Sequence, residues 1–133
     1  FIPGRQELAD IDEFVGKIKA VKNTQQDKNL LLIARIEALI AGWGMEEALK
    51  RGFSYSDAGA DAILIHSKNK NPDEIIEFCH EFRKKSNTPL VLVPTTLLSR
   101  QHYINFSQRL NAFGIEVREL SRFINFREEL IVL

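Results

Sequence analysis

LLLIARIEALIAGWGMEEALKRGFSYSDAGADAILIHS, residues 30–67, is the stretch that decides the fold. It contains two short apolar runs, Leu30–Ile36 and Ala62–Ile65, which have the length and composition of strands buried in a parallel sheet. Between them lies a segment with the pattern of a helix, for which Gly59 is the expected C-terminal cap. Both apolar runs end in ionisable residues, and sites in parallel sheets lie at the carboxyl ends of the strands. The stretch therefore predicts a strand–helix–strand unit with functional groups at one edge.

The same alternation of helices and strands continues on both sides of this unit. Further helices are predicted at Glu7–Lys22, Asp73–Ser86 and Ser99–Gly114, and further strands at Leu90–Thr96 and Ile115–Leu120. The last residues, 121–133, have the pattern of a short helix or a tail. Helix and strand recur about every 30 residues, which is the length of a βα crossover unit. The predicted fold class is therefore α/β with a parallel sheet.

The composition is that of an ordinary globular domain without net charge. The 133 residues include 18 lysines and arginines and 18 aspartates and glutamates, so no overall field favours nucleic acid or an anionic membrane. No apolar run approaches the roughly 18 residues that a membrane helix needs. The one cysteine, Cys79, excludes an internal disulfide and fits a reducing compartment, so a cytoplasmic protein is expected. The chain begins at Phe1, without a methionine or a signal-peptide pattern, which predicts that it was cut from a longer protein.

Arg35 is the first candidate site residue, because it places a cation at the exit of a buried strand. A guanidinium there can clamp a carboxylate or a phosphoryl group through two parallel hydrogen bonds. The alternative is a structural ion pair, since buried arginines are usually paired. Glu37 lies two residues on, and therefore on the same side of the strand. It could orient Arg35, hold a metal-bound water, or serve only as a salt-bridge partner.

His66 ends the next strand along the chain. A neutral imidazole there could donate a hydrogen bond to a substrate oxygen, although a lone histidine in apolar surroundings is more often a satisfied structural group. Ser67 is either a further substrate contact or a cap at the strand end. Thr95 and Thr96, near the end of the third predicted strand, face the same rim and are candidate substrate contacts.

Other residue patterns argue against several common kinds of site. His80 and His102 fall on predicted helices, far from the strand ends, and no spacing of His, Cys and Asp suggests zinc. There is no Walker or GxGxxG phosphate loop. Trp43, between two glycines, is predicted to pack against the fold, Cys79 to lie in the core, and Lys68–Asn71 to form a solvated turn.

Two segments, ARIEALIAGWGMEEALKR and then AGADAILIHSK, resemble the phosphoenolpyruvate mutase and isocitrate lyase superfamily. The helix ELADIDEFVGKIKA and the strand PLVLVPTT fit the same pattern, so the resemblance covers Glu7 to Thr96 and favours the phosphoenolpyruvate mutase and phosphonopyruvate hydrolase branch. The lyase branch more usually carries Thr-Asp after the arginine, where this chain has Ile36 and Glu37. The resemblance implies a (β/α)8 (TIM) barrel. Residues 1–133 would form its second half as one partial domain, family-like over 1–96 and divergent over 97–133.

The resemblance also implies a function and the residues that carry it. The intact protein would be a phosphoenolpyruvate phosphomutase, an isomerase of phosphonate metabolism that interconverts phosphoenolpyruvate and phosphonopyruvate. Arg35 and His66 would be catalytic, and together with Ser67 and Thr95 they would bind the substrate, a small 2-oxo acid or phosphonate. The cofactor would be Mg2+, with its principal ligands upstream of Phe1 and none in this chain.

Several alternatives stay open at this point. The same pattern accommodates a phosphonopyruvate hydrolase, an oxaloacetate hydrolase, or a lyase that cleaves a carbon–carbon bond of 2-methylisocitrate. An alternative of another class is a catalytically inactive half-barrel, and the chain alone is expected to be inactive because the metal-binding acids would be missing. Glu37 would at most hold a water bound to the metal. The intact protein is expected to be a homo-oligomer that binds neither nucleic acid nor membranes.

Overall fold

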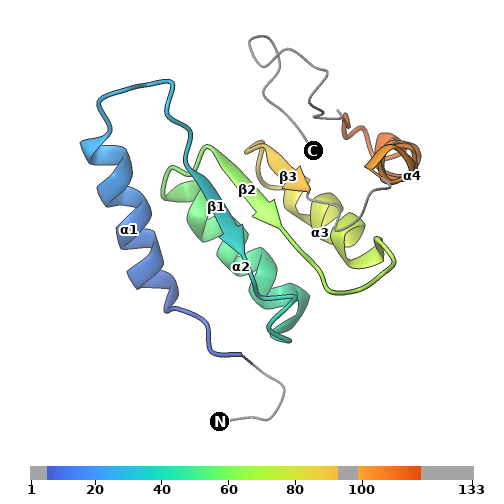
Figure 1. The fold of residues 1–133 in the computed structure, drawn as a ribbon, viewed down its shortest axis with the longest axis horizontal. Coiled ribbons are helices and arrows are strands. Elements are labelled where there is room, and N and C mark those ends of the chain that lie inside the picture. Colours follow the sequence, from blue (N-terminus) through green and yellow to red (C-terminus); the bar gives the residue numbers. More distant parts are fainter. Residues whose placement is uncertain (1–5, 93–98, 118–133) are drawn as a thin grey trace.

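The computed structural model describes residues 6–92 and 99–117, in which helices and strands alternate along the chain (Figure 1). The elements are α1 (Ile11–Thr24), β1 (Ile33–Ile36), α2 (Gly44–Asp57), β2 (Ala62–Ile65), α3 (Asp73–Arg83), β3 (Leu90–Leu92) and α4 (Ser99–Asn111). The three strands are parallel and lie in the order β1-β2-β3. Figure 1 shows α2 and α3 behind the sheet, with α1 and α4 at its two sides. The predicted α/β class with a parallel sheet is confirmed.

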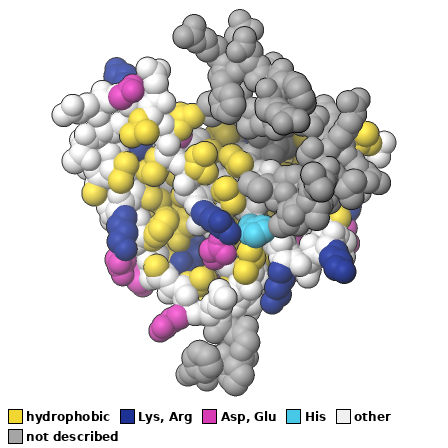
Figure 2. All heavy atoms as spheres, in the orientation of Figure 1, with side chains coloured by type: hydrophobic (Ala, Val, Ile, Leu, Met, Phe, Trp, Pro, Cys, Tyr) yellow, Lys and Arg dark blue, Asp and Glu magenta, His cyan; other side chains and the backbone are white. Residues whose placement is uncertain are grey.

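The two faces of the sheet have different surroundings. Ala34, Ile36, Ile63 and Ile65 point toward the helices and are buried, with exposed fractions of 3% or less. Side chains alternate along a strand, so the neighbouring residue Ile33 points to the opposite face, where it is 46% exposed. Figure 2 shows hydrophobic side chains gathered on this second face, which is turned toward the viewer. The helices of the described residues therefore cover one face of the sheet.

Aromatic side chains join α2 to α3 at the centre of the core. Phe78 and Phe82 are fully buried, and their rings stack with centroids 5.5 Å apart. Phe53 also stacks on Phe82, with ring centroids 5.1 Å apart. Gly52 allows this close approach, because a Cβ atom added there would lie 3.1 Å from Phe78 Cζ and 3.2 Å from Phe82 Cε2. The contact between α2 and α3 thus depends on a glycine facing two rings.

The two earliest elements begin later than the sequence pattern predicts. α1 starts at Ile11 rather than Glu7, because the Asp10 carboxylate accepts hydrogen bonds from the amides of Asp12 and Glu13 and so caps the helix. β1 starts at Ile33 rather than Leu30. The Leu32 amide donates to the Asp61 carboxylate at 2.7 Å, which takes this donor out of the strand ladder.

The C-terminal predictions are tested only in part. Residues 115–117 do not form a strand, so the described part of the predicted strand Ile115–Leu120 is wrong. Their position is set instead by the end of α4, where the Ile115 amide donates to the Leu110 carbonyl at 3.1 Å. The rest of that predicted strand, the end of the third strand with Pro94, and residues 121–133 lie outside the described residues. Gly59, by contrast, closes α2 as predicted, with φ +107°.

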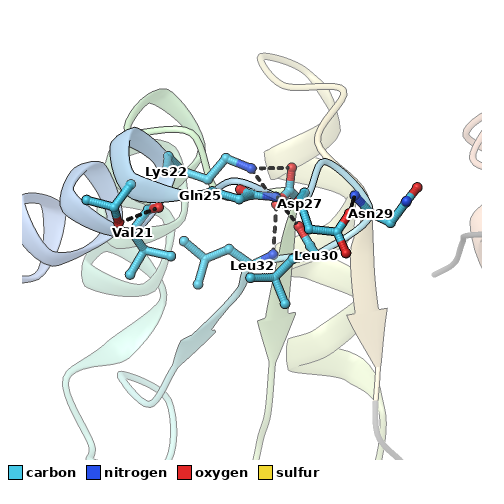
Figure 3. Close-up of polar contacts among 9 residues, drawn as sticks. Val21, Lys22, Gln25, Asp27, Asn29, Leu30 and Leu32 are labelled. Atoms are coloured by element: carbon cyan, nitrogen blue, oxygen red, sulfur yellow. Dashed lines mark hydrogen bonds and ion pairs between the residues drawn. The ribbon is translucent and has the colours of Figure 1, made fainter.

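An ion pair fixes α1 at the amino-terminal edge of the sheet (Figure 3). Lys22 Nζ lies 3.1 and 2.9 Å from the two carboxylate oxygens of Asp61, the residue before β2. The same carboxylate accepts the Leu32 amide, so one side chain joins α1, the residue before β1 and the start of β2. Gln25 closes the intervening loop by donating to the carbonyls of Asp27 and Leu30. The contacts at this edge of the sheet therefore stabilise the fold.

Asp61→Asn is expected to destabilise the protein at neutral pH and to have little effect in acid. Burial alone would raise the pKa of Asp61, but the Leu32 amide and the Lys22 ammonium together hold this pKa below its ordinary value. A carboxyl with a lowered pKa stabilises the fold above its unfolded-state pKa, about 3.9 for aspartate, and the contribution is lost as the pH falls through the folded-state pKa. Asp61→Asn should lower the free energy of unfolding by an amount on the order of 1 kcal/mol at neutral pH.

Urea unfolding of wild type and Asp61→Asn from neutral to strongly acidic pH measures this difference. The difference in free energy of unfolding between wild type and Asp61→Asn should disappear as the pH drops below the ordinary pKa of an aspartate. Glu13→Gln is the control, because it removes the exposed pair between Glu13 and Lys17 and should have a small effect throughout. A gap for Asp61→Asn that stays constant in acid would contradict the assigned role of the ion pair.

Candidate active site

Arg35 and His66 meet at the carboxyl edge of the sheet. β1 and β2 run in register, with Arg35 beside Leu64. His66 is two residues beyond Leu64, so it follows the same alternation and points to the same face as Arg35. Arg35 Nη2 lies 3.1 Å from His66 Nδ1. Two residues that are 31 positions apart in the sequence are thus in direct contact.

Glu37 completes a cluster of three polar side chains, defined here as the Arg35–Glu37–His66 cluster. Arg35 Nε donates to Glu37 Oε1, and the two side chains are 55% and 35% exposed. A guanidinium carries five N–H donors, so the bonds to Glu37 and His66 use two and leave three for other acceptors. On the face of the sheet turned away from α2 and α3, Figure 2 shows a basic, an acidic and a histidine side chain adjoining one another among hydrophobic ones.

The turn after β1 holds Glu37 in place. The Ala41 amide donates to the Glu37 carbonyl at 2.8 Å, and the Trp43 amide donates to the Ala38 carbonyl at 2.8 Å. Gly42 and Gly44, on either side of Trp43, have φ of +80° and +86°, a backbone region that favours glycine. Trp43 packs against the core, as predicted, and its indole Nε1 donates to the Gln6 carbonyl at 2.7 Å.

Ser67 does not join the Arg35–Glu37–His66 cluster. It follows His66 directly, so it has the opposite orientation along the strand and lies toward the helices, where it is 6% exposed. Its hydroxyl donates to Glu74 Oε2 at 2.5 Å and accepts the Asn69 amide at 3.1 Å. Glu74 was not singled out from the sequence, although an acid in the first turn of the following helix is a signal for such a contact. Thr95 and Thr96 lie outside the described residues.

The described residues do not by themselves fit a magnesium site. Mg2+ is held in proteins by carboxylates and other oxygen ligands. Residues 6–92 and 99–117 contain no group of three or more His, Cys, Asp or Glu side chains that could hold a metal ion. The carboxylate of Glu37 is engaged by Arg35. What this edge of the sheet offers is hydrogen-bond donors, which suit an anion.

Cys79 and His80, both on α3, are not part of the Arg35–Glu37–His66 cluster. Burial raises the pKa of the Cys79 thiol to about 12, so the thiol stays protonated and is a core group rather than a nucleophile. The His80 ring packs against Phe113 on the outer side of α3, with centroids 4.1 Å apart. His102 lies in α4. Within residues 6–92 and 99–117, none of the helices has both the length and the apolar character required to cross a bilayer.

A family model and two of the most similar relatives point to phosphoenolpyruvate phosphomutase and the related phosphonopyruvate hydrolase. The family whose model matches residues 3–120 is described as phosphoenolpyruvate phosphomutase. A phosphoenolpyruvate phosphomutase of Tetrahymena pyriformis is 61% identical over 92 residues, which are 69% of this chain and 30% of that protein. A phosphonopyruvate hydrolase of Variovorax sp. (strain Pal2) is 56% identical over 92 residues, 69% of this chain and 31% of that protein.

A solved structure extends this likeness to the fold. The crystal structure of a phosphonopyruvate hydrolase in complex with oxalate and Mg2+ matches with a TM-score of 0.69 and 45% identity, over 82% of this chain and 38% of that chain. The parallel strand order and the alternating helices agree with the predicted partial (β/α)8 barrel, which is confirmed. The chain spans about a third of the length of the relatives it matches.

Proposed function

The chain belongs to the phosphoenolpyruvate phosphomutase family, and from this premise we propose that Arg35 and His66 bind an anionic group of a small 2-oxo acid or phosphonate substrate. The observation that carries the proposal is the 3.1 Å contact between Arg35 Nη2 and His66 Nδ1 at the carboxyl edge of parallel strands. In (β/α)8 barrels that edge is the one on which active sites are built. The opposite edge of this sheet is occupied by the structural Lys22–Asp61 pair.

The chemistry of the cluster suits oxygen anions. Arg35 keeps three N–H donors beyond its bonds to Glu37 and His66, and a guanidinium matches the geometry of a carboxylate or phosphoryl group. During transfer a phosphoryl group carries its negative charge on its peripheral oxygens, in a loose transition state. Fixed donors aimed at such oxygens stabilise the developing charge without having to reorganise.

For the whole protein we propose phosphoenolpyruvate phosphomutase activity. In this isomerisation the bond between phosphorus and the enol oxygen of phosphoenolpyruvate breaks, and a bond between phosphorus and C3 of the same molecule forms. The 61% identity to a phosphomutase supports the proposal. Phosphonopyruvate hydrolase is the second candidate, because a relative with that name is nearly as similar, at 56%. Mg2+ is the proposed cofactor, supported by the relative crystallised with it, and its ligands would be residues other than those described.

A chimera tests whether this chain supplies a working part of such a site. In it, residues 6–92, from α1 through β3, replace the corresponding segment of the Tetrahymena phosphomutase. Phosphorus NMR follows phosphonopyruvate, since a carbon–phosphorus bond and a phosphate ester give separate signals. We expect conversion to phosphoenolpyruvate. Conversion to pyruvate and phosphate would favour the hydrolase. A folded chimera with no turnover would support the inactive half-barrel instead.

A further inference from the structure

We propose that Arg35 and Glu37 act as positioning residues that hold His66 in one neutral tautomer, with its hydrogen on Nε2. The inference deepens the proposed function and rests on it for the identity of the ligand, an anionic substrate oxygen. The tautomer itself follows from contacts within the chain. It concerns the state of His66 before any ligand arrives.

The contact between Arg35 and His66 defines which imidazole nitrogen lacks a hydrogen. Arg35 Nη2 and His66 Nδ1 are 3.1 Å apart, within hydrogen-bond distance. A guanidinium has donors but no acceptor, and it stays protonated in proteins. Nδ1 must therefore accept, which it can do only without a hydrogen. A neutral imidazole then carries its single hydrogen on Nε2.

Glu37 fixes the guanidinium that makes this contact. The Arg35 side chain is 55% exposed, so little packing restrains it. Its Nε donates to Glu37 Oε1, and a carboxylate on Nε restricts rotation of the planar group. Glu37 is two residues from Arg35 on the same face of β1, and the turn after β1 holds its backbone through the Ala41 amide. The order of contacts is therefore Glu37 to Arg35 to His66.

The consequence for a ligand is a pair of donors of fixed orientation. His66 Nε2–H is directed away from Arg35, and Arg35 retains three N–H donors. His66 Nε2–H and the Arg35 donors can therefore serve different carboxylate or phosphonate oxygens of a ligand. The opposite tautomer would present an acceptor at Nε2 and would repel an oxygen placed there. The tautomer thus decides whether His66 favours or opposes anion binding.

Nitrogen-15 NMR of the 133-residue chain, with labelled histidine and no ligand, tests the tautomer directly. The His66 signals are identified by their loss in His66→Gln. In wild type we expect a protonated Nε2, a non-protonated Nδ1, and no detectable Nδ1–H tautomer. In Arg35→Ala and Glu37→Ala the Nδ1–H tautomer should become detectable, because the donor to Nδ1 is lost or released. Glu13→Gln, which removes an exposed carboxylate of the Glu13–Lys17 pair, should leave the His66 signals unchanged.

The results separate this inference from the proposed function. A hydrogen on Nδ1 in wild type, or a tautomer ratio that neither alanine variant changes, would overturn the inference. If the ratio changes in Arg35→Ala alone, the role of Glu37 is overturned. Addition of oxalate to the same samples then reports on the function. If His66 is the Nε2–H tautomer but oxalate does not bind, the proposed function is contradicted and the positioning role of Arg35 and Glu37 stands. If oxalate binds while His66 is a mixture of tautomers, the positioning role is contradicted and the proposed function stands.

Discussion

Arg35→Ala is expected to lower kcat/KM of the chimera for phosphonopyruvate by about 10³-fold or more. The estimate follows from the losses seen when one fixed oxyanion donor or one arginine at a transferring phosphoryl group is removed. The substitution removes the three available N–H donors of Arg35 and also the contact that orients His66. Because the side chain is 55% exposed, the fold should be nearly unaffected, and thermal unfolding checks this.

Two variants make the result specific. Arg35→Lys keeps the charge but loses the planar fork, so its activity should fall between wild type and Arg35→Ala. Arg83→Ala removes an arginine at the end of α3, whose guanidinium contacts the Ser86 carbonyl at 3.5 Å, remote from the Arg35–Glu37–His66 cluster. Its kcat/KM should stay close to wild type. If Arg35→Ala retains full activity, the assignment of Arg35 to the substrate site is wrong.

Phe82→Ala is expected to cost about 3–5 kcal/mol of stability, the largest structural effect of any single substitution considered. Phe82 is fully buried and stacks on both Phe53 and Phe78, so its loss leaves a cavity between α2 and α3. The backbones there already approach closely at Gly52, which limits how far the helices can collapse into the space. The free energy of unfolding of a domain is only about 5–15 kcal/mol, so the variant should unfold at a much lower urea concentration than wild type.

Phe113→Ala is the matched control for this prediction. Phe113 follows α4, is 54% exposed, and contacts the His80 ring. Removing it deletes the same number of atoms from a largely exposed position, so the cost should be below about 1 kcal/mol. Urea unfolding followed by circular dichroism compares the two variants. Equal losses would contradict the placement of Phe82 at the centre of the core.

The sequence predicted the meeting of Arg35 and His66 but not the separation of Ser67. Polar residues at the ends of two apolar runs were expected to share an edge, since parallel strands bring their carboxyl ends together. Alternation of side chains then decides which of two neighbours faces the site. Ser67 is two residues after Ile65, so its side chain lies on the same face as Ile65 and donates to Glu74. His66 is two residues after Leu64, so its side chain lies on the opposite face, with Arg35. Because side chains alternate along a strand, the sequence could have predicted that His66 and Ser67 point to opposite faces of the sheet.

Element boundaries were harder to predict because single polar side chains set them. The hydrophobic pattern runs through Leu8, yet the cap formed by Asp10 starts α1 at Ile11. The apolar run begins at Leu30, yet the bond between the Leu32 amide and Asp61 shortens β1. Asp61 lies 29 residues from Leu32 in the sequence. This second contact is long-range and leaves no local signal, whereas the Asp10 cap is local but lies outside the hydrophobic pattern. Hydrophobic periodicity therefore predicted the order of the elements but not their ends.

Titration of the 133-residue chain with oxalate, followed by backbone and histidine NMR, tests the central claim most directly. We expect signals of Arg35, Glu37 and His66 to shift together on saturation. Affinity should fall about tenfold to a hundredfold in Arg35→Ala, since a hydrogen bond to a charged group contributes about 1.5–3 kcal/mol. It should be unchanged in Arg109→Ala, which removes an exposed arginine paired with Asp73. Shifts that leave these three residues untouched, or equal affinity in wild type and Arg35→Ala, would contradict an anion site at this edge.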